Sequence, residues 1–170
     1  MTESMGSLTT EQENEKSVGL DEMSPLEIVT LMNEEDQKVA KAVKEALPAI
    51  AGAVEVIVAS FKAGGRLIYV GAGTSGRLGI LDASELPPTF GGVPHRAVAL
   101  LAGGRDAVFR AKEGAEDDAG SGKRDLQKIR LKERDVVVGI SASGRTPYVI
   151  GALEYAKRIG AKTIALSCNR

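Results

Sequence analysis

Two short loops of this chain contain the residue types that bind small anions. The first runs from Gly71 to Arg77 (GAGTSGR) and the second from Ser141 to Thr146 (SASGRT). Each contains glycine, hydroxyl side chains and one arginine, and each follows a short apolar run. Small residues let backbone N–H groups approach an anion, and a helix N-terminus adds a favourable dipole. Two such loops facing one crevice would hold a compact phosphorylated ligand.

The first loop also fits the dinucleotide pattern G-x-G-x-x-G, which gives a rival interpretation. A dinucleotide site needs an acidic residue near the end of the next strand to bind a ribose hydroxyl. The next apolar run, 97–101, is followed by Ala-Gly-Gly and no acid. Arg105 could meet a 2′-phosphate, so an NADP site stays open as the weaker alternative. The second loop has no role in a dinucleotide site, and the residues therefore favour a sugar phosphate.

The loops need strands before them and helices after them, and the apolar pattern predicts both. Short β-branched runs without alternation are typical of strands buried on both faces. The predicted strands are 67–70, 97–101, 135–140 and 162–167. The predicted helices are, roughly, 75–85, 106–117, 123–129 and 147–159. Alternating strands and helices predict an α/β fold, in which a parallel sheet has helices on both faces.

A helical segment is predicted before the sheet. Ser24 is expected to cap it, with Pro25 at the first helical position and Glu27 closing a capping box. Apolar residues then recur every three or four positions as far as Phe61, with a kink or restart expected at Pro48. The chain is accordingly divided into an acidic segment (1–23), N-terminal helices (24–63) and a sheet domain (64–170).

Composition excludes several classes of function. The chain of 170 residues is 43% hydrophobic, and it has neither a membrane-spanning apolar run nor an apolar signal core, so a cytoplasmic protein without membrane contact is expected. One cysteine, Cys168, and one histidine, His95 in a predicted surface turn, are too few for a zinc site. Aromatic residues are only 4%, which argues against nucleic-acid binding.

Longer motifs around the loops make the sequence similar to a known enzyme family. The stretches Leu67–Glu85, Pro87–Phe90, Glu113–Asp117 and Ser141–Ile150 resemble N-acetylmuramic acid 6-phosphate etherases, a branch of the sugar isomerase (SIS) domain superfamily. The similarity covers the N-terminal part of the family's usual length, so a C-terminally truncated chain is expected. The resemblance implies a flavodoxin-like SIS fold after an N-terminal helical segment. The same branch includes the glucokinase regulatory protein, which binds sugar phosphates without etherase chemistry.

The resemblance implies a lyase that cleaves the D-lactyl ether of N-acetylmuramic acid 6-phosphate during recycling of cell-wall amino sugars. Two carboxylates in opposite protonation states suffice for elimination and water addition, without metal or organic cofactor. By motif match these are Glu85, expected as the acid near a helix C-terminus, and Glu116, expected as the base. Without the family match, each would be interpreted as a solvated acid.

The resemblance also implies a set of phosphate-binding and sugar-binding residues. They are Ser141, Ser143, Gly144 and Thr146 of the second loop, and Gly73, Thr74 and Ser75 of the first. Arg77 and Arg145 are expected either to brace their loops or to pair across an interface between two copies, since SIS domains generally form homodimers. Two alternative functions remain: a sugar-phosphate-binding regulatory module without turnover, and an aldose–ketose isomerase.

Overall fold

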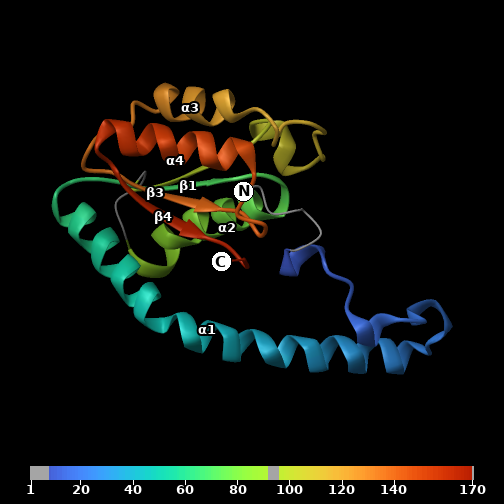
Figure 1. Cartoon of the computed structure of the whole chain (residues 1–170). Helices are drawn as coiled ribbons and strands as arrows, with labels where there is room; N and C mark the ends of the chain where they lie inside the picture. The colour runs from blue at the N-terminus through green and yellow to red at the C-terminus, as the bar shows by residue number, and fades with distance from the viewer. Residues whose placement is uncertain (1–7, 92–95, 170) are drawn as a thin grey trace. The chain divides into compact units, whose positions relative to one another are not determined.

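The computed structural model describes residues 8–91 and 96–169, so His95 lies outside the described residues. The chain forms two compact units, Met1–Val54 and Glu55–Arg170, which are described separately below. The boundary between them falls inside the long helix α1, Pro25–Lys62 (Figure 1).

The first unit contains most of α1, and between residue 8 and α1 the structure describes three short 3-10 helices. These are η2 (Thr9–Glu11), η3 (Glu15–Ser17) and η4 (Leu20–Glu22). The predicted capping box at the start of α1 is confirmed. The Glu27 carboxylate accepts the Ser24 N–H at 2.7 Å, and the Glu27 N–H donates to Ser24 Oγ at 3.4 Å. The restart expected at Pro48 is wrong, because α1 continues through it. A proline removes one backbone donor, and the alanine-rich sequence on both sides favours helix.

The second unit is built on four parallel strands, and the predicted strands are confirmed to within a residue or two. They are β1 (Leu67–Gly71), β2 (Ala97–Leu101), β3 (Val136–Ile140) and β4 (Lys162–Leu166), in the order β2-β1-β3-β4. From β1 the chain adds β2 on one side and then returns to add β3 on the other. The strand order therefore reverses between β1 and β3, which is where open α/β sheets bind ligands.

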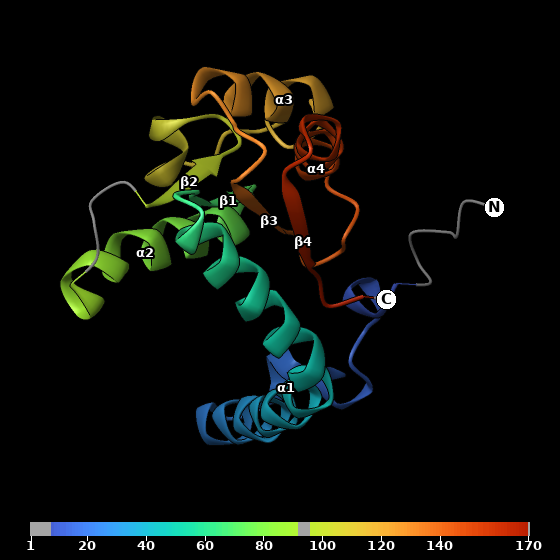
Figure 2. The ribbon, with the colours of Figure 1, turned by 90° about the vertical axis from the view of Figure 1, so that its left-hand side faces the viewer.

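Helices cover both faces of the sheet, as the sequence predicts (Figures 1 and 2). Helices α3 (Ala119–Lys128) and α4 (Pro147–Ile159) pack on one face, against side chains such as Ile68 and Val137. Helix α2 (Gly73–Phe90) and the last turns of α1 pack on the other, against residues such as Val136 and Val138. Neighbouring residues of β3 thus point to opposite faces, and both faces are buried.

Three predicted helices differ from those in the structure. The helix expected at 106–117 is only a short 3-10 helix, η5 (Arg105–Val108), followed by turns, in which Gly114 has a positive φ of 69°. Helix α2 runs past Glu85 to Phe90 and ends at Gly91, whose φ of 65° is easy only for glycine. Helix α3 begins before residue 123, because Asp118 caps it by accepting the Ser121 N–H at 3.1 Å.

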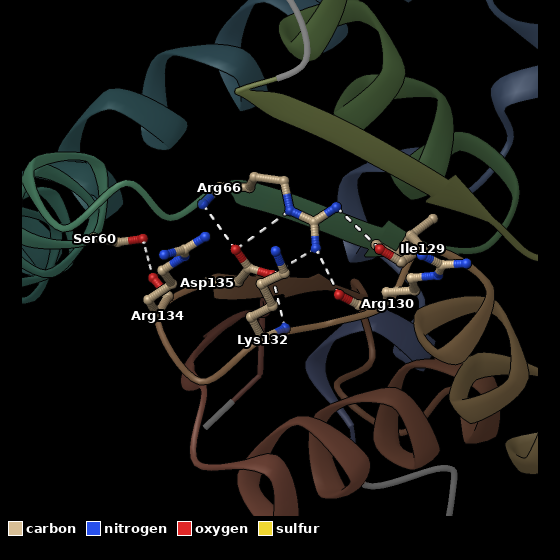
Figure 3. A network of polar contacts seen from close by, with 7 residues as sticks. All are labelled: Ser60, Arg66, Ile129, Arg130, Lys132, Arg134 and Asp135. Carbon is tan, nitrogen blue, oxygen red and sulfur yellow. Dashed lines mark hydrogen bonds and ion pairs between the residues drawn. The ribbon is translucent and has the colours of Figure 1, made fainter.

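A buried ion pair joins the amino ends of β1 and β3 (Figure 3). The Arg66 guanidinium contacts the Asp135 carboxylate at 2.7 Å, and Asp135 is only 1% exposed. The remaining Arg66 N–H groups donate to the carbonyl oxygens of Ile129 and Arg130 at 3.1 Å. The Lys132 N–H donates to Asp135 at 2.9 Å. This network fixes the register of β1 against β3 at one end of the sheet, and the two loops leave those strands at the other.

Candidate functional site

The two glycine- and hydroxyl-rich loops lie side by side at the carboxyl edge of the sheet. Strands β1 and β3 are neighbours, with Gly71 opposite Ile140 in the last paired position. Adjacent parallel strands are about 4.8 Å apart, so loops that leave them at the same level share one crevice. The crevice coincides with the point where the strand order reverses.

The three glycines of the first loop have different roles. Gly71 and Gly76 lie back to back, since a Cβ on Gly71 would sit 2.6 Å from the Gly76 nitrogen. Gly73 has a φ of 53° and open space around its Cα. Two glycines therefore allow close packing of β1 on α2, and one allows the turn into the helix. Thr74 and Ser75 lie in the first turn of α2, with Thr74 exposed and Ser75 half-buried.

The hydroxyl groups of the second loop gather around Ser141. Ser141 is buried, and its Oγ lies 2.8 Å from Thr146 Oγ1 and 3.4 Å from Ser143 Oγ. The same oxygen accepts the Gly144 N–H at 3.1 Å, and Ser143 Oγ accepts the Arg145 N–H at 3.2 Å. Each hydroxyl proton can rotate about its C–O bond, so a group that donates to a neighbouring hydroxyl here can donate to an anion instead. The loop is therefore organised as a donor cluster.

Arg77 braces the first loop against the segment that follows β2. Its Nε donates to the carbonyl oxygen of Val108 and its Nη2 to that of Ala107, both at 2.8 Å. Of the two roles left open for Arg77 by the sequence, these contacts account for the bracing one. The guanidinium geometry suits this role, because one planar group spans two carbonyl oxygens.

A cavity of about 170 Å³ lies beside the first loop. Its lining includes residues of the first loop, Arg77 among them, and residues of η5 and the turns after it. The residues are Ala72, Gly73, Arg77, Ala102, Ala107 and 111–116. Glu116 is thus placed at the cavity together with Gly73. Lys112 and Glu113 also line the cavity. The sequence did not predict them as site residues, since charged residues in an acidic turn resemble a solvated surface.

Glu116 is also tied to the second loop through its backbone. Its carbonyl oxygen accepts the N–H of Tyr148, in the first turn of α4, at 2.9 Å. Its side chain is exposed. One residue thereby adjoins the cavity of the first loop and the helix that follows the second.

Glu85 does not reach this cavity within one chain. It lies on α2 more than three turns beyond Gly73, which is about 18 Å along the helix axis. It is exposed, and because α2 continues to Phe90 it is not in the last helical turn. The expected placement at the helix end is therefore wrong. Its neighbour Asp82 is engaged elsewhere, as the acceptor for the Tyr69 hydroxyl. Burial and the Asp82 carboxylate raise the pKa of Tyr69.

Among residues 8–91 and 96–169, no three His, Cys, Asp or Glu side chains gather closely enough to bind a metal ion. Within the same ranges, no helix is long and apolar enough to cross a membrane.

Residues 49–157 match the family model described as the glucokinase regulatory protein N-terminal SIS domain. The chain belongs to this SIS-domain family. Solved structures with this fold include a phosphoheptose isomerase from Francisella tularensis (TM-score 0.64, 22% identity, 85% of this chain and 75% of that one). A phosphoheptose isomerase from Neisseria gonorrhoeae gives a TM-score of 0.60 at 20% identity, covering 82% and 72% of the two chains. These similarities confirm the SIS-type α/β fold.

Curated proteins are similar to nearly the whole chain at higher sequence identity. The chain is 64% identical over 163 residues to an N-acetylmuramic acid 6-phosphate etherase of Halalkalibacterium halodurans, covering 96% of this chain and 55% of that protein. It is 59% identical over 166 residues to the etherase of Serratia proteamaculans, covering 97% and 56%. The chain thus spans about half the length of the curated relatives it matches.

Proposed function

We propose that this SIS domain is part of an enzyme that cleaves the D-lactyl ether of N-acetylmuramic acid 6-phosphate, giving N-acetylglucosamine 6-phosphate and D-lactate. The observation that carries the proposal is the position of Glu116, which adjoins both the cavity and the start of α4. The similarity to etherases at 64% identity supports the same reaction. We place the reaction in the cytoplasm, in the recycling of cell-wall amino sugars.

The phosphate is assigned to the second loop. The hydroxyl groups of Ser143 and Thr146 lie within 3.4 Å of Ser141 Oγ, so three hydroxyl groups are close together. Gly144, with its positive φ, allows the loop to turn. Hydrogen bonds from neutral donors to an anion are stronger than those between neutral groups. The first loop, with Gly73, Thr74 and Ser75, faces the same crevice and is assigned to the sugar.

Glu116 is assigned as the general base. In the open-chain aldehyde, the C2 proton is acidic because it lies next to the carbonyl carbon. The Glu116 carboxylate takes that proton, the C2–C3 double bond forms, and the bond from C3 to the lactate oxygen breaks. Water then adds at C3 and C2 regains a proton, which restores the sugar. The lactate oxygen needs a proton as it leaves, which requires an acid.

Glu85 is assigned as that acid, and its distance from the cavity leads us to propose that a second copy supplies it. About 18 Å of α2 separates Glu85 from Gly73, and no side chain bridges that separation. Leu78 and Leu81 share the Glu85 face of α2 and are 56% and 57% exposed. An apolar stripe of this kind suits contact with another copy in a homodimer. In that arrangement each site combines Glu116 of one copy with Glu85 of the other.

The test uses protein at the length of the curated relatives, incubated with N-acetylmuramic acid 6-phosphate in deuterated water. D-lactate reports cleavage and deuterium at C2 reports proton abstraction. Glu116→Gln is expected to lose both signals. Glu85→Gln is expected to lose D-lactate and keep C2 exchange, because proton abstraction does not need the acid. Loss of exchange in Glu85→Gln alone would reverse the two assignments.

A mixture of the two variants tests the shared site. Random pairing of Glu116→Gln with Glu85→Gln copies creates mixed dimers with one intact site, so activity is expected to return to about a quarter of wild type. Both variants separately inactive, with no recovery on subunit exchange, would refute a site shared between copies.

A second candidate is favoured by the family model, which is named for a regulatory protein. In this alternative the domain binds a sugar phosphate without turnover. Sugar-phosphate binding with neither D-lactate nor C2 exchange would support it. Exchange accompanied by an aldose–ketose conversion would instead support the isomerase alternative.

A further inference from the structure

The segment after β4 holds one carbonyl group of the second loop. The Ala142 carbonyl oxygen accepts the Cys168 N–H at 3.0 Å and the Asn169 side-chain amide at 3.2 Å. Ser167 Oγ lies 3.3 Å from the same oxygen. Ser167 Oγ also accepts the Asn169 N–H at 3.0 Å, which folds the segment back on itself. Donors from three consecutive residues thus converge on one peptide oxygen.

Fixing this carbonyl also fixes the direction of the next N–H group. A trans peptide is planar, so the Ser143 N–H points opposite to the Ala142 carbonyl. The carbonyl faces the segment after β4, and β4 and β1 lie on opposite sides of β3. The Ser143 N–H therefore faces the side of β1 and the first loop. The next two N–H groups, of Gly144 and Arg145, donate to serine hydroxyl oxygens within the loop.

The close approach of Gly144 to Ser167 is a second sign that the two segments fit together. A Cβ on Gly144 would lie 2.9 Å from Ser167 Oγ, and Gly144 has a φ of 74°. A side chain there would both strain the backbone and displace Ser167.

We propose that Asn169 and Ser167 are positioning residues that hold the 142–143 peptide so that the Ser143 N–H donates to the bound phosphate. This inference rests on the proposed function, because it assigns the phosphate to the second loop. Without the contacts at Ala142, the peptide is free to turn and present its carbonyl oxygen to the phosphate. Carbonyl and phosphate oxygens repel each other, so the same peptide that favours binding would then oppose it.

The test measures inorganic phosphate and glucose 6-phosphate binding to the full chain by the amide signals of a nitrogen-15-labelled sample. In the wild type, phosphate is expected to move the Ser143 amide proton downfield, as a charge-assisted hydrogen bond does. Asn169→Ala is expected to weaken phosphate binding about tenfold and to shrink the Ser143 shift at saturation. Asn33→Ala, which removes an amide that contacts Gln37 on α1, is the matched control and is expected to change neither.

Each other outcome overturns the inference in a recognisable way. An unchanged affinity and Ser143 shift in Asn169→Ala would refute the positioning role and leave the phosphate loop in place. Weaker binding with a full Ser143 shift at saturation would show that Asn169 acts without orienting this peptide. No phosphate-dependent shift in residues 141–146 of the wild type would refute the phosphate site itself. If Asn169→Ala does not fold, Ser167→Ala is tested by the same two measurements. Its phosphate affinity is expected to fall at least twofold, and its Ser143 shift at saturation is expected to shrink.

Discussion

Glu116 accepts the backbone N–H of Tyr148 at 2.9 Å, and this bond connects the proposed base to the helix behind the second loop. Tyr148 is fully buried, and its hydroxyl donates to Asp125 of α3 at 3.0 Å. Burial, together with the Asp125 carboxylate, raises the pKa of Tyr148, so the phenol stays protonated and keeps donating. The backbone of Glu116 is therefore held by a buried anchor, although its carboxylate is exposed.

The hydroxyl cluster of the second loop predicts a strong dependence of phosphate affinity on Thr146. Thr146→Val keeps the shape of the side chain and removes the hydroxyl that lies 2.8 Å from Ser141 Oγ. Loss of a hydrogen bond to a charged ligand costs about 1.5–3 kcal/mol, or roughly a 10- to 100-fold weaker affinity. Titration calorimetry with glucose 6-phosphate measures the change. Thr30→Val on α1, whose hydroxyl donates to Leu26, should bind as wild type; equal affinity in both variants would move the phosphate elsewhere.

Arg77 is expected to control the mobility of the turns that carry Glu116. Lysine keeps the charge but cannot donate to the carbonyl oxygens of Ala107 and Val108 at once. Arg77→Lys should therefore speed amide hydrogen exchange in residues 105–117 about tenfold, which corresponds to about 1.4 kcal/mol of local opening free energy. Mass spectrometry of the exchanged peptides measures the rate. Arg124→Lys, at an exposed pair with Asp118, serves as the control, and faster exchange throughout the domain would argue against a local brace.

Gly76 should resist substitution because β1 packs directly against α2 at this position. An added Cβ would lie 2.3 Å from Leu101 Cδ1 and 2.7 Å from the Gly71 carbonyl oxygen. Gly76→Ala is expected to lower the free energy of unfolding by about 1–3 kcal/mol, as overpacking does. Gly52→Ala places the same methyl on α1 with nothing within 4 Å and should be neutral or stabilising. Urea denaturation of both variants compares them; similar stability would contradict the tight contact.

The ion pair of Arg66 and Asp135 predicts how stability changes in acid. Burial by itself raises the pKa of Asp135, but hydrogen bonds from Arg66 and the Lys132 N–H outweigh it and lower the pKa below its ordinary value. The stabilisation is therefore present above the unfolded pKa of about 3.9 and is lost as the pH falls through the lower, folded value.

Asp135→Asn should accordingly destabilise the domain most at neutral pH, by about 3 kcal/mol, and progressively less below pH of about 4. Thermal unfolding of variant and wild type from neutral pH into this acid range measures the difference. Glu34→Gln, at a carboxylate that is 54% exposed and pairs with Lys16, provides a comparison of smaller expected effect. A difference between Asp135→Asn and wild type that stays constant with pH would exclude the ion pair as its cause.

Local sequence determined the strands, the two loops and the capping box at Ser24 and Glu27. Short β-branched runs bury both faces of a strand wherever the chain places them, and glycines and hydroxyls mark a turn by their own geometry. Helix ends were less predictable. Helix α2 continues through Pro87 and Pro88 to Phe90, and it ends before Gly91, where the backbone turns left-handed.

Tertiary structure decided which residues far apart in the sequence come into contact, because the local sequence pattern does not contain this information. Arg77 meets carbonyl oxygens 30 and 31 residues away, and Ala142 is held by donors 25 to 27 residues later. The separation of Glu85 from the cavity follows from the length of α2, whereas sequence motifs alone placed Glu85 and Glu116 in one site. Strand order brought the two loops together, because β1 and β3 pair although β2 lies between them in sequence. Such contacts depend on packing over the whole sheet, which no short stretch of residues encodes.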